Sequence, residues 1–397
     1  MNINKEIAGF NDELIELRRN FHRHPELGLQ EFRTAEKIIA YLNNCGVEVD
    51  KKRYNQTGVV GLIHGGQPGP TLMLRADMDA LAVQEQTDVP FRSKTPGKMH
   101  ACGHDGHLAM LLVAAKILNR CKHHLKGNVK LVFQPNEEAV GALEMIKASV
   151  LENPRVDACM GLHLWVPLET GKMGISAGPV MGGMDHFRLR LVGKGGHTGN
   201  PQEGVDPINT AAHIITAVQS LQTREINALK PTTLMFGTVN GGTADNIIAE
   251  TVELTGTLRY LYESDGESEE NPRGRFERIV TSVCDAFRTD IDLMWEHHQP
   301  ALVNDPGMAE MASTVAVRIL NKSDAIVSYV TMAGDDFAEF SKQIPGVFCF
   351  IGCGNRQKQA TFPHHHPRFT IDEDALALGV KMHVRFALKF LGYENPL

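Results

Sequence analysis

The sequence lacks the features that mark membrane, secreted and nucleic-acid-binding proteins. No uninterrupted apolar segment approaches the ~18 residues that can span a bilayer. The first 28 residues are charged and amphipathic, without the apolar core or the small-residue cleavage site of a signal peptide. The net charge is −7, and lysine and arginine form no cluster that could neutralise a run of phosphates. We therefore expect neither a membrane nor a nucleic acid as partner.

The sequence also lacks a disulfide framework. Its seven cysteines are an odd number and are scattered without regular spacing, which predicts reduced thiols and a cytoplasmic location. Most of them have apolar neighbours, as core residues do, and Cys102 is the exception. There are no internal repeats and no low-complexity segments. The chain does have 397 residues, enough for two domains, and 18 histidines that occur in clusters.

Strand-like and helix-like segments alternate from the N-terminus to residue 183 and again from residue 298 to the end. This alternation predicts an α/β domain with helices on both faces of its sheet. The segment 184–297 instead follows the order strand–helix–strand–strand–helix–strand, which is typical of a split βαβ, ferredoxin-like α+β domain. We expect a discontinuous catalytic domain, 1–183 and 298–397, with a smaller domain inserted at 184–297.

Metal-binding residue types gather where apolar strands end and helices begin, the usual position of a site in an open α/β sheet. The densest group is MHACGHDGH at 99–107, which contains Cys102 and His104. Thiolate and imidazole ligands suit zinc, and nearby carboxylates extend the range to manganese or cobalt. Histidines and cysteines near a helix start are more often capping or packing residues, but the density of this group predicts a metal site.

Two adjacent glutamates, Glu137 and Glu138, follow the apolar strand VKLVFQP, whose proline ends the strand. Adjacent glutamates usually lie on a solvated surface. At a sheet edge, however, one could bind a metal while the other remains a free base, as metal-assisted hydrolysis requires. Taken alone, His163 could be a core histidine and His364–His366 an exposed polar turn.

Ten motifs follow one another in a fixed order over nearly the whole chain. They are RRNFHRHPELG, LRADMDAL, MHACGHDGH, FQPNEE, GLHLW, GKGGHTGNP, GGTADNII, GTLR, GDDFAEF and HHHPRF. In this order they resemble the aminoacylase/carboxypeptidase family of dinuclear metallohydrolases, in its branch of hippurate hydrolases, N-acyl-L-amino acid amidohydrolases and auxin-conjugate (IAA-amino acid) hydrolases. The resemblance implies a metallopeptidase-like catalytic domain with a central mixed sheet flanked by helices. It also implies that the inserted domain is a lid and dimerisation domain.

The resemblance further implies two divalent ions per subunit, with zinc, manganese, cobalt and nickel all open. The implied ligands are Cys102, which would bridge the ions, His104, Glu138, His163 and His365. The family's C-terminal His-x-Pro pattern falls on His365, and His364 is the alternative if the turn is shifted.

The resemblance assigns catalytic roles as well. Glu137 would be the general base, and Asp79 would orient a ligand histidine. His197 would reach the active site of the partner subunit and stabilise the oxyanion, which makes a homodimer part of the mechanism. Asn246 and Arg259 match positions that contact the polar end of the substrate, and an arginine fork suits a carboxylate. Without the resemblance, Arg259 could be an ordinary surface strand residue.

The chain departs from the family pattern at positions that bear on substrate choice. Ala82 and Ala249 stand where proline is usual, and Asp335 stands where a glutamate is usual. The acidic loop 264–274 is longer than expected. None of these departures removes an implied ligand.

The sequence thus predicts a metal-dependent amidohydrolase that cleaves N-acyl amino acids (acetyl, benzoyl or similar) with metal-activated water. A carboxypeptidase or dipeptidase on unblocked peptides is the alternative within the enzyme class, because both bind a carboxylate and cleave the adjacent amide. A metal-dependent binding protein is the alternative outside it, although such a protein has no use for the spare carboxylate of Glu137. A redox-active thiol protein is a weaker alternative, because it would need a resolving cysteine and none lies near Cys102 in the sequence.

Overall fold

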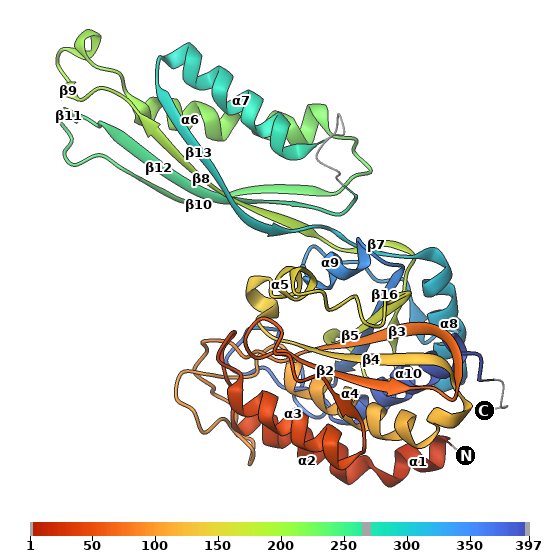
Figure 1. Ribbon diagram of the computed structural model, residues 1–397. Coiled ribbons are helices and arrows are strands. Elements are labelled where there is room, and N and C mark those ends of the chain that lie inside the picture. The colour runs from red at the N-terminus through yellow and green to blue at the C-terminus, as the bar shows by residue number, and fades with distance from the viewer. Residues whose placement is uncertain (1–2, 264–270, 394–397) are drawn as a thin grey trace. The chain divides into compact units, whose positions relative to one another are not determined.

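The computed structural model describes residues 3–263 and 271–393 (Figure 1). The chain divides into two compact units, each described by itself below. Unit 1 consists of Met1–Val180, Val303–Val330 and Asp335–Leu397, and unit 2 of Met181–Leu302 and Thr331–Gly334. The insert expected at 184–297 lies inside unit 2, and the return of four residues at 331–334 was not expected. Residues 264–270 of the expected acidic loop lie outside the described residues.

Unit 1 contains an eight-stranded mixed sheet in the order β1-β2-β4-β3-β5-β16-β6-β15. Its strands are β1 (Glu48–Val49), β2 (Val59–His64), β3 (Gln67–Asp77), β4 (Lys126–Gln134), β5 (Ala158–Glu169), β6 (Met173–Gly174), β15 (Ile326–Val327) and β16 (Gly346–Gly354). The four central strands β4, β3, β5 and β16 are parallel, whereas β2 pairs antiparallel with both of its neighbours and β6 pairs antiparallel with β16 but parallel with β15. The carboxyl ends of the central strands therefore meet at one edge of the sheet.

Helices cover both faces of this sheet, with α5 and α9 on one face and α2, α4 and α10 on the other (Figure 1). The helices of unit 1 are α1 (Ile3–Gly9), α2 (Asn11–Arg23), α3 (Phe32–Asn44), α4 (His104–Arg120), α5 (Ala142–Lys147), α8 (Pro306–Leu320), α9 (Phe337–Ser341) and α10 (Asp374–Phe390), with short 3-10 turns at Lys122–His124 and Glu137–Ala139. This arrangement confirms the predicted α/β class with a mixed sheet flanked by helices. Within the described ranges, no helix combines the length and apolarity needed to cross a membrane.

The central helix α4 is buried on nearly every side because it packs between the sheet and the helices α2 and α10. A helix that is apolar all round is stable only in such a position. The apolar segment GHLAMLLVAAKIL predicts a helix over residues 106–118, but α4 begins at His104, so the histidine cluster lies in its first turn.

The sequence pattern of the first 45 residues predicts two helices, but the segment forms three, α1, α2 and α3. The first break falls at Phe10, between α1 and α2. From the sequence, Asp12 is a candidate cap for the helix through Leu14, Leu17 and Phe21, but this is wrong, because α2 begins at Asn11 without a side-chain cap. Gly46, which follows the helical segment AEKIIAYLNNC, predicts a left-handed helix cap, and its φ of 71° confirms it.

Unit 2 is a four-stranded antiparallel sheet in the order β10-β12-β8-β13, with two helices packed against it. Its elements are β8 (Gly183–Val192), β9 (Gly196–His197), α6 (Pro207–Ala217), β10 (Thr232–Gly241), β11 (Ile247–Ile248), β12 (Thr251–Tyr260), α7 (Pro272–Phe287) and β13 (Asp290–Gln299), with short turns at Pro201–Glu203 and Leu221–Glu225. The strands β7 (Gly178–Met181) and β14 (Leu302–Asn304) contain two of the points at which the chain passes between units, and the return at 331–334 gives the others. The order of strands and helices is that of the predicted ferredoxin-like α+β domain.

Leu112→Ala tests whether α4 is the packing centre of unit 1. Leu112 lies mid-helix and has no exposed surface, so its truncation should lower the free energy of unfolding by about 2–5 kcal/mol. Trp165 and Trp295, the two tryptophans of the chain, lie in different units. In a Trp295→Phe background, fluorescence during urea unfolding therefore reports on unit 1. The control is Val317→Ala, which removes a side chain that is 39% exposed, and an equal loss in both variants would contradict the packing argument.

Candidate metal centre and active site

The polar clusters singled out in the sequence converge at the carboxyl edge of the parallel strands. Asp77 ends β3 and pairs in register with Gln134, the last residue of β4. The next strand, β5, brings His163 to the edge, in register with Phe350 of β16. This is the edge at which open α/β sheets bind their ligands.

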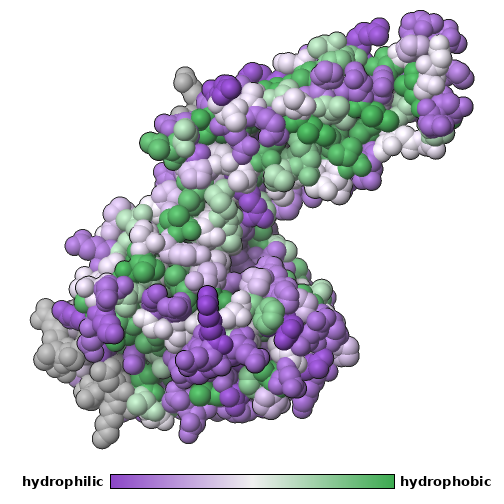
Figure 2. All heavy atoms as spheres, turned by 180° about the vertical axis from the view of Figure 1, so that it is seen from behind, coloured by the Kyte–Doolittle hydropathy of each residue, from purple (hydrophilic) through white to green (hydrophobic). Residues whose placement is uncertain are grey.

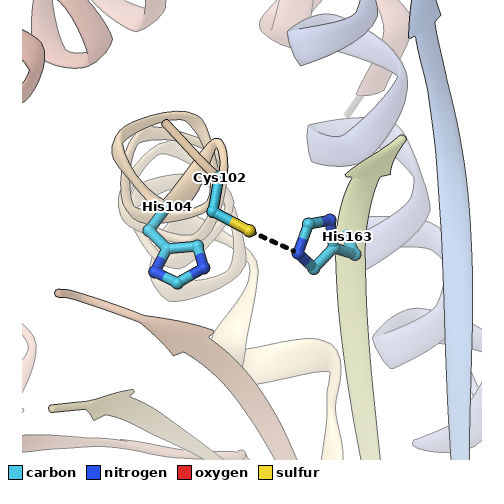
Figure 3. Close-up of side chains that lie close together, drawn as sticks. All are labelled: Cys102, His104 and His163. Atoms are coloured by element: carbon cyan, nitrogen blue, oxygen red, sulfur yellow. Dashed lines mark hydrogen bonds between the residues drawn. The ribbon is translucent and has the colours of Figure 1, made fainter. Parts of the chain in front are cut away.

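A single glycine lets Cys102 and His104 face the same space. Gly103 has a φ of 97°, in the left-handed region, and it is the residue from which α4 starts. Any other residue type would be strained there. The turn brings the thiol and the imidazole into one group with His163 (Figure 3), where Cys102 Sγ lies 3.6 Å from His163 Nε2.

Backbone carbonyls fix the rings of two histidines so that one nitrogen of each is free to bind a metal. His104 Nδ1 donates to the carbonyl of Asp79 at 2.9 Å, and His163 Nδ1 donates to the carbonyl of Leu164 at 2.8 Å. Among the described residues, the buried Nε2 of His104 has no hydrogen-bond partner. A neutral imidazole held in this way is a typical metal ligand.

Asp79 contacts both halves of the centre. Its Oδ1 lies 3.4 Å from Nδ1 of His104, and its Oδ2 accepts a hydrogen bond from the backbone N–H of Glu138 at 3.1 Å. These contacts agree with the orienting role expected for Asp79, because one side chain contacts both His104 on α4 and the turn Glu137–Ala139 that follows β4.

The C-terminal histidines separate into two different environments. His365 has a φ of 68°, and its Nε2 lies 3.2 Å from Oε1 of Glu138. His364 instead donates from Nε2 to the carbonyl of Leu164 at 3.0 Å and stacks on Trp165, with ring centroids 4.4 Å apart. The geometry therefore favours His365 as the ligand and leaves His364 in a supporting position.

Among the described residues, two of the five groups of ligand-type atoms share one sulfur. One group joins Cys102 to His104 and His163, and the other joins Cys102 to Glu138 and His365, with all ligand atoms of a group within 4.8 Å of one another. Sulfur, imidazole and carboxylate form a donor set that fits zinc and neighbouring divalent metals. The residues present thus fit the two ions that were expected, with Cys102 common to both candidate ligand groups.

The electrostatics of the cluster call for added positive charge. Burial, and then the carboxylates of Glu138 and Glu137, raise the pKa of the Cys102 thiol well above its ordinary value. Burial and then the neighbouring Asp335 raise the pKa of Glu137 well above its ordinary value. Burial opposes the protonation of His104, but the charge of Asp77 and contacts with Asp79 raise its pKa to about 10. Divalent ions would favour the deprotonated ligands instead.

A layer of buried residues beneath the ligands was only partly anticipated. His107 belongs to the dense cluster but is fully engaged, since Nδ1 lies 2.6 Å from Asp77 and Nε2 accepts from the backbone N–H of Leu164. Behind Asp77, the guanidinium of Arg75 is completely buried. The sequence feature that could have indicated a buried Arg75 is its position as a charged residue in the apolar strand TLMLRAD.

A second buried network explains the first motif of the chain, RRNFHRHPELG. Arg18 Nε lies 2.8 Å from Asp105, the residue after His104, and His22 lies between Asp105 at 2.7 Å and Glu85 at 3.2 Å. The opposing charge of Arg18 and the contacts with His22 outweigh burial, the largest effect, and hold the pKa of Asp105 far below its ordinary value. Helix α2 is thereby attached to the first turn of α4.

The expected residues of unit 2 fall into two places. His197 lies on β9 and is exposed. Strand β9 pairs with β11, and Asn246 is the residue that directly precedes β11. Both residues line a cavity of about 790 Å³ within unit 2. Thr251 at the start of β12 lines the same cavity, and Arg259 lies eight residues further along this strand, or about 26 Å away in an extended strand. The guanidinium of Arg259 donates to the carbonyl of Met332. Within one subunit, Arg259 therefore does not join His197 and Asn246.

Comparison with known proteins agrees with this geometry. The profile of Peptidase family M20/M25/M40 matches residues 73–389. The chain belongs to this family. It is 36% identical to a thermostable carboxypeptidase of Saccharolobus solfataricus over 98% of both chains, and 35% identical to an N-acetylcysteine deacetylase of Bacillus subtilis over 96% of this chain and 97% of the relative. A dinuclear metal-binding M20 peptidase from Bacillus subtilis has a similar structure, with a TM-score of 0.84, 33% identity and coverage of 97% of this chain and 99% of that one.

Family membership confirms the predicted resemblance and the predicted class of enzyme. The protein is a metal-dependent amidohydrolase of this family, and its candidate ligand groups fit a pair of metal ions, as expected from the similar dinuclear M20 peptidase. The assignment of individual ligands and catalytic residues stays a prediction.

The shared sulfur leads to a test of metal stoichiometry. We expect the wild-type protein to bind close to two ions per chain and Cys102→Ala clearly fewer, because both groups lose a ligand at once. Elemental analysis after dialysis measures the ratio. His364→Gln, which changes a histidine outside the two groups, should stay close to two. Equal metal content in wild type and Cys102→Ala would remove the bridging assignment.

Proposed function

We propose that the protein hydrolyses the amide bond of N-acyl amino acids, releasing a carboxylate and a free amino acid. The single observation that carries this proposal is the position of Glu137 beside the two ligand groups. Its carboxylate shares a group with His104 and Glu138, but it is not needed to complete either group around Cys102. A free, buried carboxylate next to a metal pair is what a hydrolase needs as general base.

The chain's own residues then divide the work. Bound ions supply Lewis acidity that polarises the scissile carbonyl and acidifies water. Glu137 accepts a proton from the attacking water and returns it to the leaving amine. Asp79 keeps His104 and the Glu138 turn in place. The donor set is compatible with zinc, manganese, cobalt or nickel, with zinc and manganese as the first to test.

We further propose that the enzyme is a cytoplasmic homodimer in which unit 2 serves as lid and dimerisation domain. One observation in support is the edge strand β10, which carries the exposed side chains Met235 and Val239. Apolar surface is visible on unit 2 in Figure 2. Isologous pairing of such a surface is the commonest route to a dimer. His197 and Asn246 would then serve the active site of the partner subunit, and Arg259 would bind the substrate carboxylate.

A carboxypeptidase or dipeptidase is the second candidate function, favoured by the similarity to a thermostable carboxypeptidase. The substrates of the two functions differ in one group. An unblocked dipeptide has a free amine on the residue that supplies the scissile carbonyl, whereas the acetyl or benzoyl group of an N-acyl amino acid has none. A screen of the metal-reconstituted enzyme against N-acetyl and N-benzoyl amino acids and against free dipeptides separates them. Faster turnover of the dipeptides would reject our first choice, and turnover of neither class would reject both.

The paired glutamates should behave differently on substitution. Glu137→Gln should keep its metals and lose turnover by roughly 10²- to 10⁴-fold, because only proton transfer is removed. Glu138→Gln should lose metal affinity. Metal titration combined with steady-state kinetics measures both, and Glu144→Gln on the surface of α5 is the neutral control. The reverse pattern would mean that the two roles are exchanged.

The role of His197 is tested by complementation. His197→Ala should cost about 10²- to 10³-fold in turnover without changing metal content, as expected for the loss of an oxyanion donor. Mixing His197→Ala subunits with Glu137→Gln subunits should restore part of the activity, because a mixed dimer contains one site with both wild-type residues. If labelled subunits exchange and activity stays absent, His197 does not act on the partner subunit.

A further inference from the structure

The segment 135–141, which carries Glu137 and Glu138, is held in an unusual backbone conformation. Asn136 has a φ of 58° and Val140 a φ of 65°, both in the left-handed region. The second value is costly, because a β-branched residue rarely adopts it. Such a turn persists only if contacts outside it hold it in place.

One carboxylate, that of Asp336, closes this segment at both ends. At the start, Gln134 Nε2 donates to Oδ1 and Oδ2 of Asp336 at 2.7 and 2.8 Å. At the other end, the backbone N–H of Ala142 donates to Oδ2 at 2.8 Å. Asp336 precedes α9 and is completely buried. Two sequence-distant donors on either side of the glutamate turn are therefore fixed by the same group.

Arg75 completes the arrangement and fixes its orientation. Its guanidinium donates to Oε1 of Gln134 at 2.8 Å and to Oδ1 of Asp336 at 3.0 Å. The amide of Gln134 is thus forced to present its oxygen to Arg75 and its NH₂ to Asp336. A buried network in which every member is satisfied has one arrangement, which is how it can define the position of a neighbouring turn.

We propose that Asp336 is a positioning residue that sets the location of the glutamate turn through Gln134 and Ala142. The inference rests on the proposed function of Glu137 as general base. It has a readout that does not need activity, because the Ala142 N–H and the backbone of 135–141 should open more often when the carboxylate is lost. Catalysis should suffer because a small displacement of a reacting group has a large effect on rate.

The experiment compares Asp336→Asn with Asp372→Asn in the full-length protein. Asp372 is a matched control: it is buried in unit 1 and bonded to a cation, an amide and a backbone N–H, those of Lys358, Asn355 and Asp374. We expect the amides of 135–142 to exchange at least about tenfold faster than in the wild-type protein in Asp336→Asn, but not in Asp372→Asn. Hydrogen–deuterium exchange with mass spectrometry measures these rates. In metal-loaded enzyme, kcat should fall about 10- to 100-fold with little change in KM.

A rescue separates positioning from general loss of stability. Gln134→Glu combined with Asp336→Asn restores the charge opposite Arg75 and the link between positions 134 and 336, so exchange and kcat should partly recover. If Asp336→Asn does not fold, Gln134→Leu breaks the same link while keeping every charge. Unchanged exchange over 135–142, or a kcat equal to that of Asp372→Asn, would overturn the proposal. A wild-type protein without amidase activity would reject the proposed function and leave the exchange result to decide the role of Asp336.

Discussion

The carboxylates gathered at the sheet edge can be buried only together with positive charge. Removing an unpaired carboxylate from water costs several kcal/mol even after the protein relaxes. Arg75 is the built-in compensation, since its guanidinium lies 2.6 Å from Asp77, 3.2 Å from Asp335 and 3.0 Å from Asp336. Burial lowers the pKa of Arg75, but these three partners raise it above its ordinary value. One guanidinium faces more acids than it can neutralise. Burial and the neighbouring Asp335 accordingly raise the pKa of Asp336 to about 8 despite Arg75, and bound divalent ions would supply the missing charge.

The sequence predicted the parts of this arrangement that have a local signature. Apolar runs marked the central strands, and the order of elements marked the inserted α+β unit. The candidate ligands could be named because Cys102 and His104 are two positions apart, and Glu137 and Glu138 are adjacent. Where local signals were weak, the prediction failed, as at the helix break near Phe10 and the start of α4.

The supporting residues could not be predicted, because their partners are distant in the sequence. Arg75 and Asp336 are 261 positions apart, and Gln134 and Asp336 are 202 apart. An isolated arginine in a strand and a glutamine before a proline have no periodicity that would relate them. The His-x-Pro pattern already favoured His365 over His364, but the different surroundings of the two rings, a left-handed backbone angle at His365 and a stack of His364 on Trp165, have no sign in the sequence.

The buried thiol at the centre has a consequence for the protein before it acquires metal. Thiolates, not thiols, react with peroxides and with other oxidants. Cys102 is 8% exposed and its pKa is raised by burial and nearby acids, so the newly folded chain keeps this sulfur protonated and shielded. Because a thiol must lose its proton to become a ligand, these surroundings make metal capture a proton-releasing step. Metal loading should therefore become easier as the pH rises, since a higher pH favours loss of that proton.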